Sequence, residues 1–247
     1  MKKTLLLAHR GFSARYPENS PCAFEAALDY PCDGFESDVH LSKDGKLVIF
    51  HDAVLTRTSN GTGYLKDYTY EELLQFDIGS WKGEEFRGQH LWTFEQLLDF
   101  CQAHQKVLNL ELKNYEVFYA GLEEQVIAAI RAAKMEEQVF VSSFNHISMQ
   151  RFKTLAPEIR TGLLYDKPLL NMERYITDSN ADSMHPKYIL LQNQPELVPL
   201  FRSRGMGINV WTVDQAADIR EMLQLEVDCI ISNKIDFLCE TAAAFRP

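Results

Sequence analysis

Hydrophobic positions along the chain form two alternating kinds of segment. Short apolar runs that contain β-branched residues alternate with longer amphipathic stretches, which is the pattern of β/α units. The runs predict nine strands, at Thr4–His9, Gly34–Leu41, Lys46–Asp52, Val107–Lys113, Val139–Phe144, Thr161–Tyr165, Asp182–Lys187, Gly207–Val213 and Cys229–Ser232. The amphipathic stretches predict helices, among them Ser20–Tyr30, Thr93–His104, Tyr119–Lys134, Ile147–Leu155, Gln194–Arg204 and Gln215–Gln224. This alternation predicts an α/β fold of the (β/α)8 TIM-barrel type.

Two features depart from a regular barrel. The runs Gly34–Leu41 and Lys46–Asp52 are separated by only four residues, a turn in which Gly45 can adopt positive φ, so no crossover helix fits between them. One of the nine strands is therefore additional, and the pattern does not decide which.

Residues 53–92 are polar and contain glycines, with one short helical piece at Tyr70–Phe76. An interruption this long is usually functional, so we expect a small subdomain inserted into a single barrel domain over residues 1–247.

The length, net charge and cysteine pattern of the chain limit the classes of protein that it can belong to. The 247 residues suit a barrel of about 250 residues. The net charge of −10 argues against a nucleic-acid binder and requires that any phosphate site be made locally positive by a metal ion or a few placed cations. Five cysteines without CxxC spacing predict reduced thiols rather than disulfides or a zinc site. The first apolar run ends at Ala8 and no long apolar stretch follows, so we expect a cytoplasmic protein without a stable membrane anchor.

Acidic residues stand in the predicted strands. Glu36 and Asp38 are two positions apart, which places both on one face of a strand. Two carboxylates that point into a barrel repel each other unless a cation lies between them or one takes up a proton. Ordinary surface charges are the alternative, but helices cover the outer face of a barrel strand. Glu111, on the face that also carries Asn109 and Lys113, can complete a three-carboxylate site. Oxygen ligands of this kind suit Mg²⁺ or Ca²⁺.

Imidazoles and other polar groups also end the apolar runs. The first run ends in His9 and Arg10, and the third in His51. A single histidine after a strand is more often a structural hydrogen-bonding residue, but two that flank a carboxylate cluster indicate a general acid and a general base. His40 lies two residues beyond Asp38, where we expect it to face solvent. Trp211, near the end of a later strand, suits either core packing or the wall of a substrate pocket.

Several motifs in order resemble the glycerophosphodiester phosphodiesterase family. They are HRG (His9–Gly11), PEN (Pro17–Asn19), ExDV (Glu36–Val39), KDGKLVIFHD (Lys43–Asp52), ELK (Glu111–Lys113), SSF (Ser142–Phe144), WTV (Trp211–Val213) and VDCIIS (Val227–Ser232). The segment 53–92 also resembles the insertion of that family. The likeness runs over nearly the whole chain, and it is closest to the small cytoplasmic bacterial enzymes.

The resemblance implies a role for each site residue. One divalent cation, Mg²⁺ or Ca²⁺, would be held by Glu36, Asp38 and Glu111. His9 and His51 would be the acid/base pair, and Arg10 and Lys113 would contact the phosphate. The implied reaction is hydrolysis of a small-molecule glycerophosphodiester to glycerol 3-phosphate and an alcohol. Which histidine is the acid stays open, as does the nucleophile, either water or the glycerol hydroxyl of the substrate.

The chain departs from the family pattern in places. Ser232 and Asn233 stand where Thr-Asp is frequent, Asp214 stands where Asn is common, and Leu91–Gln96 differs from the usual Ile-Pro-Thr-Leu. These departures affect specificity or local packing rather than the proposed chemistry.

Three alternatives follow from the same barrel. One is an enzyme for lysophospholipids or phosphoinositides, with an apolar rim formed by Trp81, Phe86 and Trp92 of the insertion. Another is a non-catalytic binding barrel, although the presence of both histidines and all three carboxylates favours a hydrolase. A homodimer is also compatible with the sequence.

Overall fold

A closed parallel barrel forms the centre of the computed structural model, which describes residues 3–245. Within these residues eight strands run parallel, namely β1 (Leu5–His9), β2 (Gly34–Leu41), β4 (Val107–Leu112), β5 (Val139–Ser143), β6 (Arg160–Tyr165), β7 (Ser183–Pro186), β8 (Gly207–Val210) and β9 (Cys229–Ser232). Their order around the barrel is β1-β9-β8-β7-β6-β5-β4-β2, and pairing of β1 with β2 closes it. The predicted TIM-barrel fold is confirmed.

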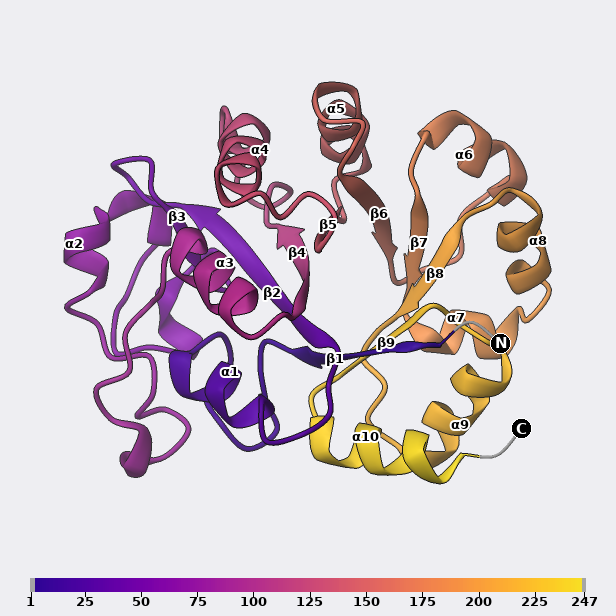
Figure 1. The fold of residues 1–247 in the computed structure, drawn as a ribbon. Helices are drawn as coiled ribbons and strands as arrows, with labels where there is room; N and C mark the ends of the chain where they lie inside the picture. Colours follow the sequence, from indigo (N-terminus) through magenta and orange to yellow (C-terminus); the bar gives the residue numbers. More distant parts are fainter. Residues whose placement is uncertain (1–2, 246–247) are drawn as a thin grey trace.

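Helices surround the strands (Figure 1). They are α1 (Pro21–Ala27), α3 (Phe94–Ala103), α4 (Leu122–Ala133), α5 (His146–Leu155), α6 (Met172–Ser179), α7 (Tyr188–Asn193), α8 (Leu197–Ser203), α9 (Ala216–Gln224) and α10 (Ile235–Ala244). The sequence pattern did not single out α6, α7 or α10. The eight-residue α6 and the six-residue α7 carry too few turns for a clear hydrophobic period, whereas the ten-residue α10 is as long as α3 and its length does not explain the omission.

The additional strand is β3 (Leu47–Ile49), which pairs antiparallel with β2 and lies outside the ring. Gly45, at φ 78°, makes the turn between the two strands. The expected strand Lys46–Asp52 is thus only three residues long, and Phe50 to Asp52 continue as irregular chain. His51 therefore lies on a loop beside the end of β2 rather than at the end of a barrel strand.

Side chains in the barrel strands alternate between two cores. Outward-facing residues such as Leu108, Leu110 and Val141 belong to the large core beneath the helices. Inward-facing Leu7, Phe140, Cys229 and Ile231 form a smaller core inside the barrel. Successive inward positions along a strand define layers of side chains across the barrel. His9 and Glu111 occupy the inward positions nearest the carboxyl ends of β1 and β4, and Asp38, which is paired with Glu111, lies two residues before His40 in β2.

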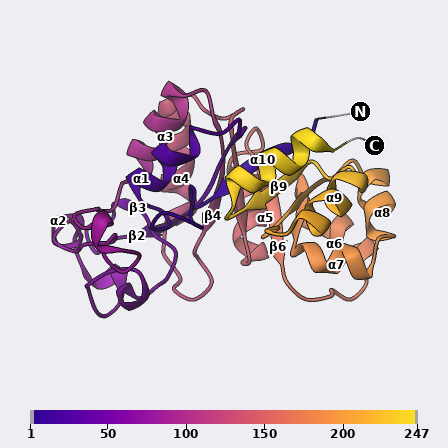
Figure 2. The ribbon, with the colours of Figure 1, turned by 90° about the horizontal axis from the view of Figure 1, so that it is seen from below.

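The segment between β3 and α3 projects from one side of the barrel, where its loops and α2 (Tyr70–Leu73) stand out in both views (Figures 1 and 2). It also contains the single 3₁₀ turns η1 (Leu55–Arg57), η2 (Leu65–Asp67) and η3 (Glu84–Phe86). Buried side chains give it a core of its own, made of Val48, Phe50, Leu55, Leu65, Leu73, Ile78 and Leu91. We refer to residues 53–92 as the insert.

Trp92, expected at an apolar rim, packs instead against the main core. Its ring stacks on Phe24 with 5.9 Å between centroids and contacts Phe100 at 5.3 Å. Phe86 packs against Tyr16 at 5.4 Å, and 38% of Trp81 is exposed. The insert therefore does not present the three rings as one exposed surface.

The turn after β1 depends on a glycine. Gly11 has φ 77°, and a Cβ atom there would lie 2.6 Å from the backbone carbonyl carbon of Ala23 in α1. Only glycine allows this close approach of helix and turn. Arg10, also in the left-handed region at φ 56°, is held by hydrogen bonds from its N–H to Glu36 O and from Asn19 N–H to its own carbonyl. The loop thereby directs the Arg10 side chain toward β2.

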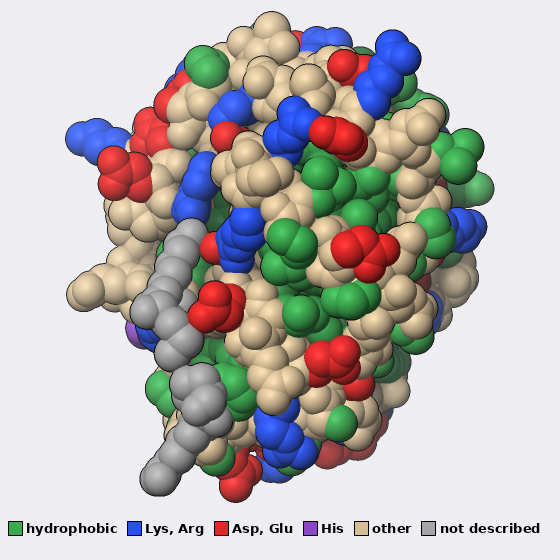
Figure 3. Space-filling model, turned by 90° about the vertical axis from the view of Figure 1, so that its right-hand side faces the viewer, with side chains coloured by type: hydrophobic (Ala, Val, Ile, Leu, Met, Phe, Trp, Pro, Cys, Tyr) green, Lys and Arg blue, Asp and Glu red, His purple; other side chains and the backbone are tan. Residues whose placement is uncertain are grey.

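Charged and apolar groups mix on the outer surface. Figure 3 shows the face over α6 and α8, where acidic and basic side chains are interspersed with hydrophobic ones. Among residues 3–245, no helix combines the length and hydrophobicity needed to cross a membrane. The cytoplasmic location and the homodimer stay predictions.

Candidate active site

A cavity of about 140 Å³ opens at the carboxyl ends of the barrel strands. Its lining includes every predicted site residue except Asp38, which is fully buried; the complete set is His9, Arg10, Glu36, His51, Asn109, Glu111, Lys113, Tyr115, Phe144, Leu164, Trp211, Thr212 and Ile231. Residues of β1, β2, β4, β6 and β9, together with residues that follow β4, β5 and β8, thus meet the loop that carries His51.

Three buried carboxylates converge in this cavity. Glu36, Asp38 and Glu111 each place an oxygen within 4.8 Å of the others. The strand register explains the convergence, because Asp38 on β2 is paired directly with Glu111 on β4 and Glu36 lies one inward position earlier. Within residues 3–245, Glu36 Oε2 and Asp38 Oδ1 find no hydrogen-bond partner although both are buried. Unpaired buried carboxylate oxygens are costly, so this cluster requires a further positive group.

The shifts in the pKa values of the three carboxyl groups also indicate that the triad lacks positive charge around it. Burial, followed by the charge of Asp38, raises the pKa of Glu36 well above its usual value. Burial also raises the pKa of Glu111, against the opposing charge of Lys113. Burial alone would raise the pKa of Asp38, but the charge of Arg10 leads the effects that hold it well below its usual range. Burial and mutual repulsion thus disfavour the ionised form of both glutamates, and a cation between the three carboxylates would relieve this cost.

Two cationic side chains border the triad. Arg10 donates from Nη1 to Glu18 Oε1 at 2.7 Å and places Nε 3.2 Å from Asp38 Oδ2. Lys113 Nζ lies 2.9 Å from Glu111 Oε1 and 3.6 Å from Asp38 Oδ1. Burial would lower the pKa of Lys113, but the charges of Glu111 and Asp38 together with the hydrogen bond to Glu111 raise it. Both side chains are thus charged at the cavity wall, where they can contact an anion.

His51 is oriented by the residue that follows it. Its Nδ1 lies 2.5 Å from Asp52 Oδ1. Burial would raise the pKa of Asp52, but the His51 and Arg57 hydrogen bonds lower it, so Asp52 is ionised and Nδ1 must be the donor. This arrangement leaves Nε2 available toward the cavity.

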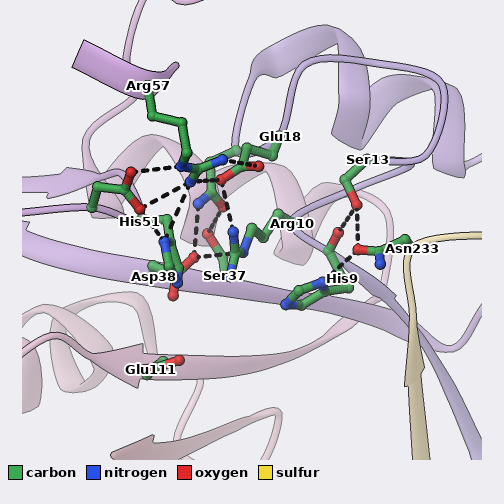
Figure 4. Close-up of polar contacts among 12 residues, drawn as sticks. His9, Arg10, Ser13, Glu18, Ser37, Asp38, His51, Arg57, Glu111 and Asn233 are labelled. Carbon is green, nitrogen blue, oxygen red and sulfur yellow. Dashed lines mark hydrogen bonds and ion pairs between the residues drawn. The ribbon is translucent and has the colours of Figure 1, made fainter. Parts of the chain in front are cut away.

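His9 is oriented by an amide instead. Its Nδ1 lies 2.6 Å from Asn233 Oδ1, and Asn233 donates from Nδ2 to Asp214 Oδ2 at 2.7 Å. The Asp214 carboxylate can only accept, which fixes the Asn233 amide with its oxygen toward His9 and makes His9 Nδ1 the donor. His9 Nε2 then faces Glu36 Oε2 at 3.6 Å. Burial, followed by the charge of Arg10, lowers the pKa of His9 to about 4. Figure 4 shows His9 and His51 on either side of Arg10.

His40 does not face solvent as expected. It is 1% exposed, with Nδ1 2.9 Å from Tyr119 Oη and Nε2 3.0 Å from the His51 carbonyl oxygen. The carbonyl can only accept, so Nε2 donates and Nδ1 accepts from the tyrosine. The β3 hairpin and the α4 loop cover this end of β2, which sequence position alone did not reveal. His40 thereby fixes the backbone that carries His51.

Other supporting residues were missed as well. Asn19 donates a hydrogen bond to Asp38 Oδ2 at 2.8 Å and accepts one from Ser37 Oγ at 2.8 Å. Glu18 accepts a hydrogen bond from Arg10. Both residues belong to the PEN motif, which was a signal available in the sequence. Asp214 and Asn233 were noted as departures from the family pattern, but the expectation that they affect only specificity or packing is wrong, because Asn233 contacts His9 directly.

Aromatic rings form one wall of the cavity. Phe144 lies nearly perpendicular to Trp211 and to Tyr115, with centroids 5.5 Å away in both cases. Trp211 is fixed by a hydrogen bond of 2.8 Å from Nε1 to the His185 carbonyl oxygen. His185 itself is fully buried, and its Nε2 contacts Ser183 and Asn209. Trp211 is therefore both packed and exposed to the cavity.

Known proteins share the sequence and the fold. Residues 9–237 match the Glycerophosphoryl diester phosphodiesterase family. A glycerophosphodiester phosphodiesterase of Caldanaerobacter subterraneus subsp. tengcongensis is 40% identical over 231 residues, covering 94% of each chain. Among solved structures, a glycerophosphodiester phosphodiesterase from Agrobacterium tumefaciens has a TM-score of 0.84 at 27% identity, covering 96% of this chain and all of the other.

A second solved structure comes with a ligand. A phosphodiesterase from Oleispira antarctica, in complex with the product sn-glycerol-3-phosphate, has a TM-score of 0.85 at 27% identity over 97% of both chains. The family match spans most of the chain and includes the histidines, the carboxylates and the insert. This chain therefore belongs to the glycerophosphoryl diester phosphodiesterase family.

Proposed function

We propose that the chain hydrolyses glycerophosphodiesters to glycerol 3-phosphate and an alcohol. The observation that carries this proposal is the cluster of Glu36, Asp38 and Glu111 at the barrel mouth, bordered by Arg10 and Lys113 and by two oriented histidines. Family membership supports it, as does the Oleispira relative that holds sn-glycerol-3-phosphate.

The three carboxylates would hold one divalent cation. Their donor set consists of oxygens alone, which suits Mg²⁺ or Ca²⁺, and the orphaned oxygens of Glu36 and Asp38 are free to accept it. When bound, such a cation supplies positive charge that stabilises the developing charge on the phosphate oxygens. Arg10 and Lys113 would contact the remaining phosphate oxygens and orient the diester.

His9 and His51 would carry the proton transfers. Each has its Nδ1 fixed as a donor, which presents Nε2 to the substrate. One would remove the proton from the nucleophile, and the other would protonate the leaving alcohol oxygen. The wall formed by Tyr115, Phe144 and Trp211 would contact the apolar parts of the bound diester.

A chelation experiment tests this proposal. Release of glycerol 3-phosphate from glycerophosphocholine would be measured in buffer, with EDTA, and after addition of Mg²⁺ or Ca²⁺ in excess. We expect activity that is lost with EDTA and restored by one of the cations. A folded, cation-supplied protein that releases no product from choline, ethanolamine, glycerol or inositol diesters would contradict the proposal. The His51→Ala variant, purified in parallel, controls for contaminating phosphodiesterases.

A diester that carries an acyl chain is a second candidate substrate. Three strongly exposed apolar side chains, Phe118 at 79%, Ile147 at 81% and Leu170 at 90%, follow β4, β5 and β6 at the same end of the barrel as the cavity. Ile147 and Leu170 line an open groove of about 460 Å³ between α5 and α6. His146 in the wall of this groove contacts the carbonyl oxygen of Leu164, a residue that lines the cavity.

The two substrates are separated by a comparison of kcat/KM. Lysophosphatidylcholine and glycerophosphocholine would be assayed with the wild type and with an Ile147→Ser, Leu170→Ser double variant. If the groove holds an acyl chain, the double variant loses activity on the lysophospholipid and keeps it on the water-soluble diester. Equal effects on both substrates would exclude the acyl-chain role.

A further inference from the structure

One arginine of the insert contacts two carboxylates of the barrel at once. Arg57 donates to Asp52 from Nε at 2.6 Å and from Nη2 at 2.9 Å. It also donates to Glu18, from Nη1 at 2.9 Å and from Nη2 at 2.6 Å. Figure 4 shows the guanidinium reaching from the insert toward Glu18 and the His51 side of the site. Both pairs are two-pronged, the geometry that a planar guanidinium matches best.

Each of the two carboxylates also contacts a residue of the active site. Asp52 contacts His51 Nδ1, and Arg57 Nη2 itself lies 3.4 Å from that nitrogen. Glu18 contacts Arg10 Nη1, and Arg10 places Nε beside Asp38. The chain of contacts therefore runs from one histidine, through Arg57, to the arginine that borders the carboxylate triad.

The position of both carboxylates depends on a positive charge between them. Glu18 and Asp52 approach the same guanidinium from two loops that are 34 positions apart in the sequence, and without it their charges would repel. The charge-assisted bonds to Arg57 contribute to the lowered pKa of both carboxyls, against the opposing effect of burial. Removal of the guanidinium would free Asp52 to turn away from His51, and Glu18 from Arg10.

The insert holds Arg57 in place. Leu55, two residues earlier in η1, is fully buried in the core of the insert, and its N–H and carbonyl are bonded to Gly63 and Ser59. The Arg57 side chain is 45% exposed, and it does not line the catalytic cavity. It therefore acts on the site through Asp52 and Glu18 rather than by contact with the diester.

We propose that Arg57 is a positioning residue through which the insert orients His51 and Arg10 together. The proposal rests on the proposed function for its kinetic test, since it assigns Arg57 to the hydrolysis of the diester. In this proposal, the insert contributes to catalysis by positioning residues that the carboxylate triad and the two histidines do not position by themselves.

Kinetics of three variants test it. Arg57→Gln removes the charge, and Arg57→Lys keeps the charge and loses the planar fork. Arg87→Gln is the matched control, because Arg87 is an exposed arginine of the same insert that pairs with Glu84. We expect kcat on glycerophosphocholine to fall about 100-fold in Arg57→Gln, as small misplacements of catalytic groups can do. Arg57→Lys should recover only a minor part, and Arg87→Gln should match the wild type.

Two further readouts distinguish positioning from a loss of folding. The double variants Arg57→Gln/Asp52→Asn and Arg57→Gln/Glu18→Gln should lose less activity than the product of the single losses, since each pair acts as a unit. The pH–rate profile should change in Arg57→Gln, because His51 loses its fixed partner. Unchanged kcat in Arg57→Gln, or full recovery in Arg57→Lys, would overturn the proposal, as would losses that multiply independently.

A spectroscopic measurement tests the positioning role of Arg57 without depending on which substrate the protein hydrolyses. The short Nδ1–H contact of His51 with Asp52 should give a downfield proton resonance, identified by its absence in His51→Ala. If the wild type hydrolyses no diester but this signal is present and is lost in Arg57→Gln, the proposed function fails while the positioning role stands. Persistence of the signal in Arg57→Gln would refute the positioning role.

Discussion

Charge balance explains the choice of side chains in the active site. Three carboxylates face two cations, Arg10 and Lys113, so the site itself carries an excess of negative charge. A divalent cation on the triad would reverse the sign and make the site attractive to a phosphodiester. The whole chain, at −10, would otherwise repel such a substrate. The proposed cation would therefore supply the local positive charge that the chain as a whole lacks.

Glu111→Gln tests one ligand of the triad. The amide keeps the shape of the side chain but removes a charge and one oxygen ligand, so we expect the cation concentration needed for half-maximal activity to rise at least about tenfold. The measurement is a titration of Mg²⁺ and Ca²⁺ against turnover. Glu124→Gln on the surface of α4 is the control. An unchanged titration would remove Glu111 from the ligand set.

His51→Ala tests the acid/base role. His51 is partly exposed at the cavity and lies outside the cores, so we expect the fold and the cation affinity to be kept. Turnover should fall by about 10²–10⁴-fold, the usual contribution of a general acid or base. The release of glycerol 3-phosphate and the melting temperature would both be measured, with His90→Ala in the insert as the control. Near wild-type rates would exclude His51 from the mechanism.

At the scale of elements, the β2–β3 hairpin and the insert complete one side of the barrel mouth. β2 is buried along its whole length, and its pairing with β4 aligns Asp38 with Glu111. β3 leads the chain back past this strand to His51, and the insert follows at once with Arg57. The side of the mouth that carries His51 therefore depends on a segment outside the regular β/α repeat.

Leu73→Ala tests whether the insert is a subdomain with its own core. Leu73 is fully buried among the insert residues, so its truncation should cost about 2–5 kcal/mol locally. We expect faster amide hydrogen exchange within residues 53–92 and lower turnover, with protection of β5 to β9 retained. Leu238→Ala, in α10 of the main core, should instead affect the barrel. Uniform loss of protection in Leu73→Ala would show that the insert and barrel unfold as one unit.

At the scale of the whole molecule, closure of the barrel brings its first and last strands together at the active site. β9 pairs with β1, which places Asn233 beside His9 across 224 positions of sequence. β1 also pairs with β2, so the HRG loop meets the carboxylates of the next strand. Closure of the barrel thus assembles the site. A ligand that binds the site should therefore stabilise the whole fold.

Cation binding should therefore raise the melting temperature. At 100 times its Kd, a cation that binds only the folded state contributes about 2.7 kcal/mol, or about 5–10 °C for a domain of this size. Wild type with EDTA would be compared with wild type in excess Mg²⁺ or Ca²⁺ by scanning calorimetry. The increase should be absent in Glu36→Gln/Glu111→Gln. An increase of equal size in that variant would place the cation elsewhere.

The increase should also depend on pH. The pKa values of Glu36 and Glu111 are raised in the cation-free fold, so their contribution to stability is lost as the pH rises through those values, and cation binding restores it. Protons and the cation compete for the same oxygens. We expect a larger rise in melting temperature at about pH 8 than at about pH 5.5. A shift of the same size at both values would contradict this competition.

Local patterns in the sequence determined the barrel and most of the site. Alternation along single strands placed Glu36 with Asp38, and Glu111 with Lys113, because side chains two apart share a face. The apolar runs that end in His9 and Arg10 indicated the barrel mouth for the same local reason. These features require only the geometry of one strand and the convergence of parallel strands at one end of a barrel.

Only the tertiary structure decided the partners of these groups. That β3 is the additional strand, that His40 is buried against Tyr119, and that Trp92 belongs to the core all follow from packing between distant segments. The Asn233–Asp214 support of His9 and the Arg57 contacts depend on barrel closure and on the fold of the insert. A strand period carries no information about which side chains from other segments will meet it, because those distances are set by the closed fold.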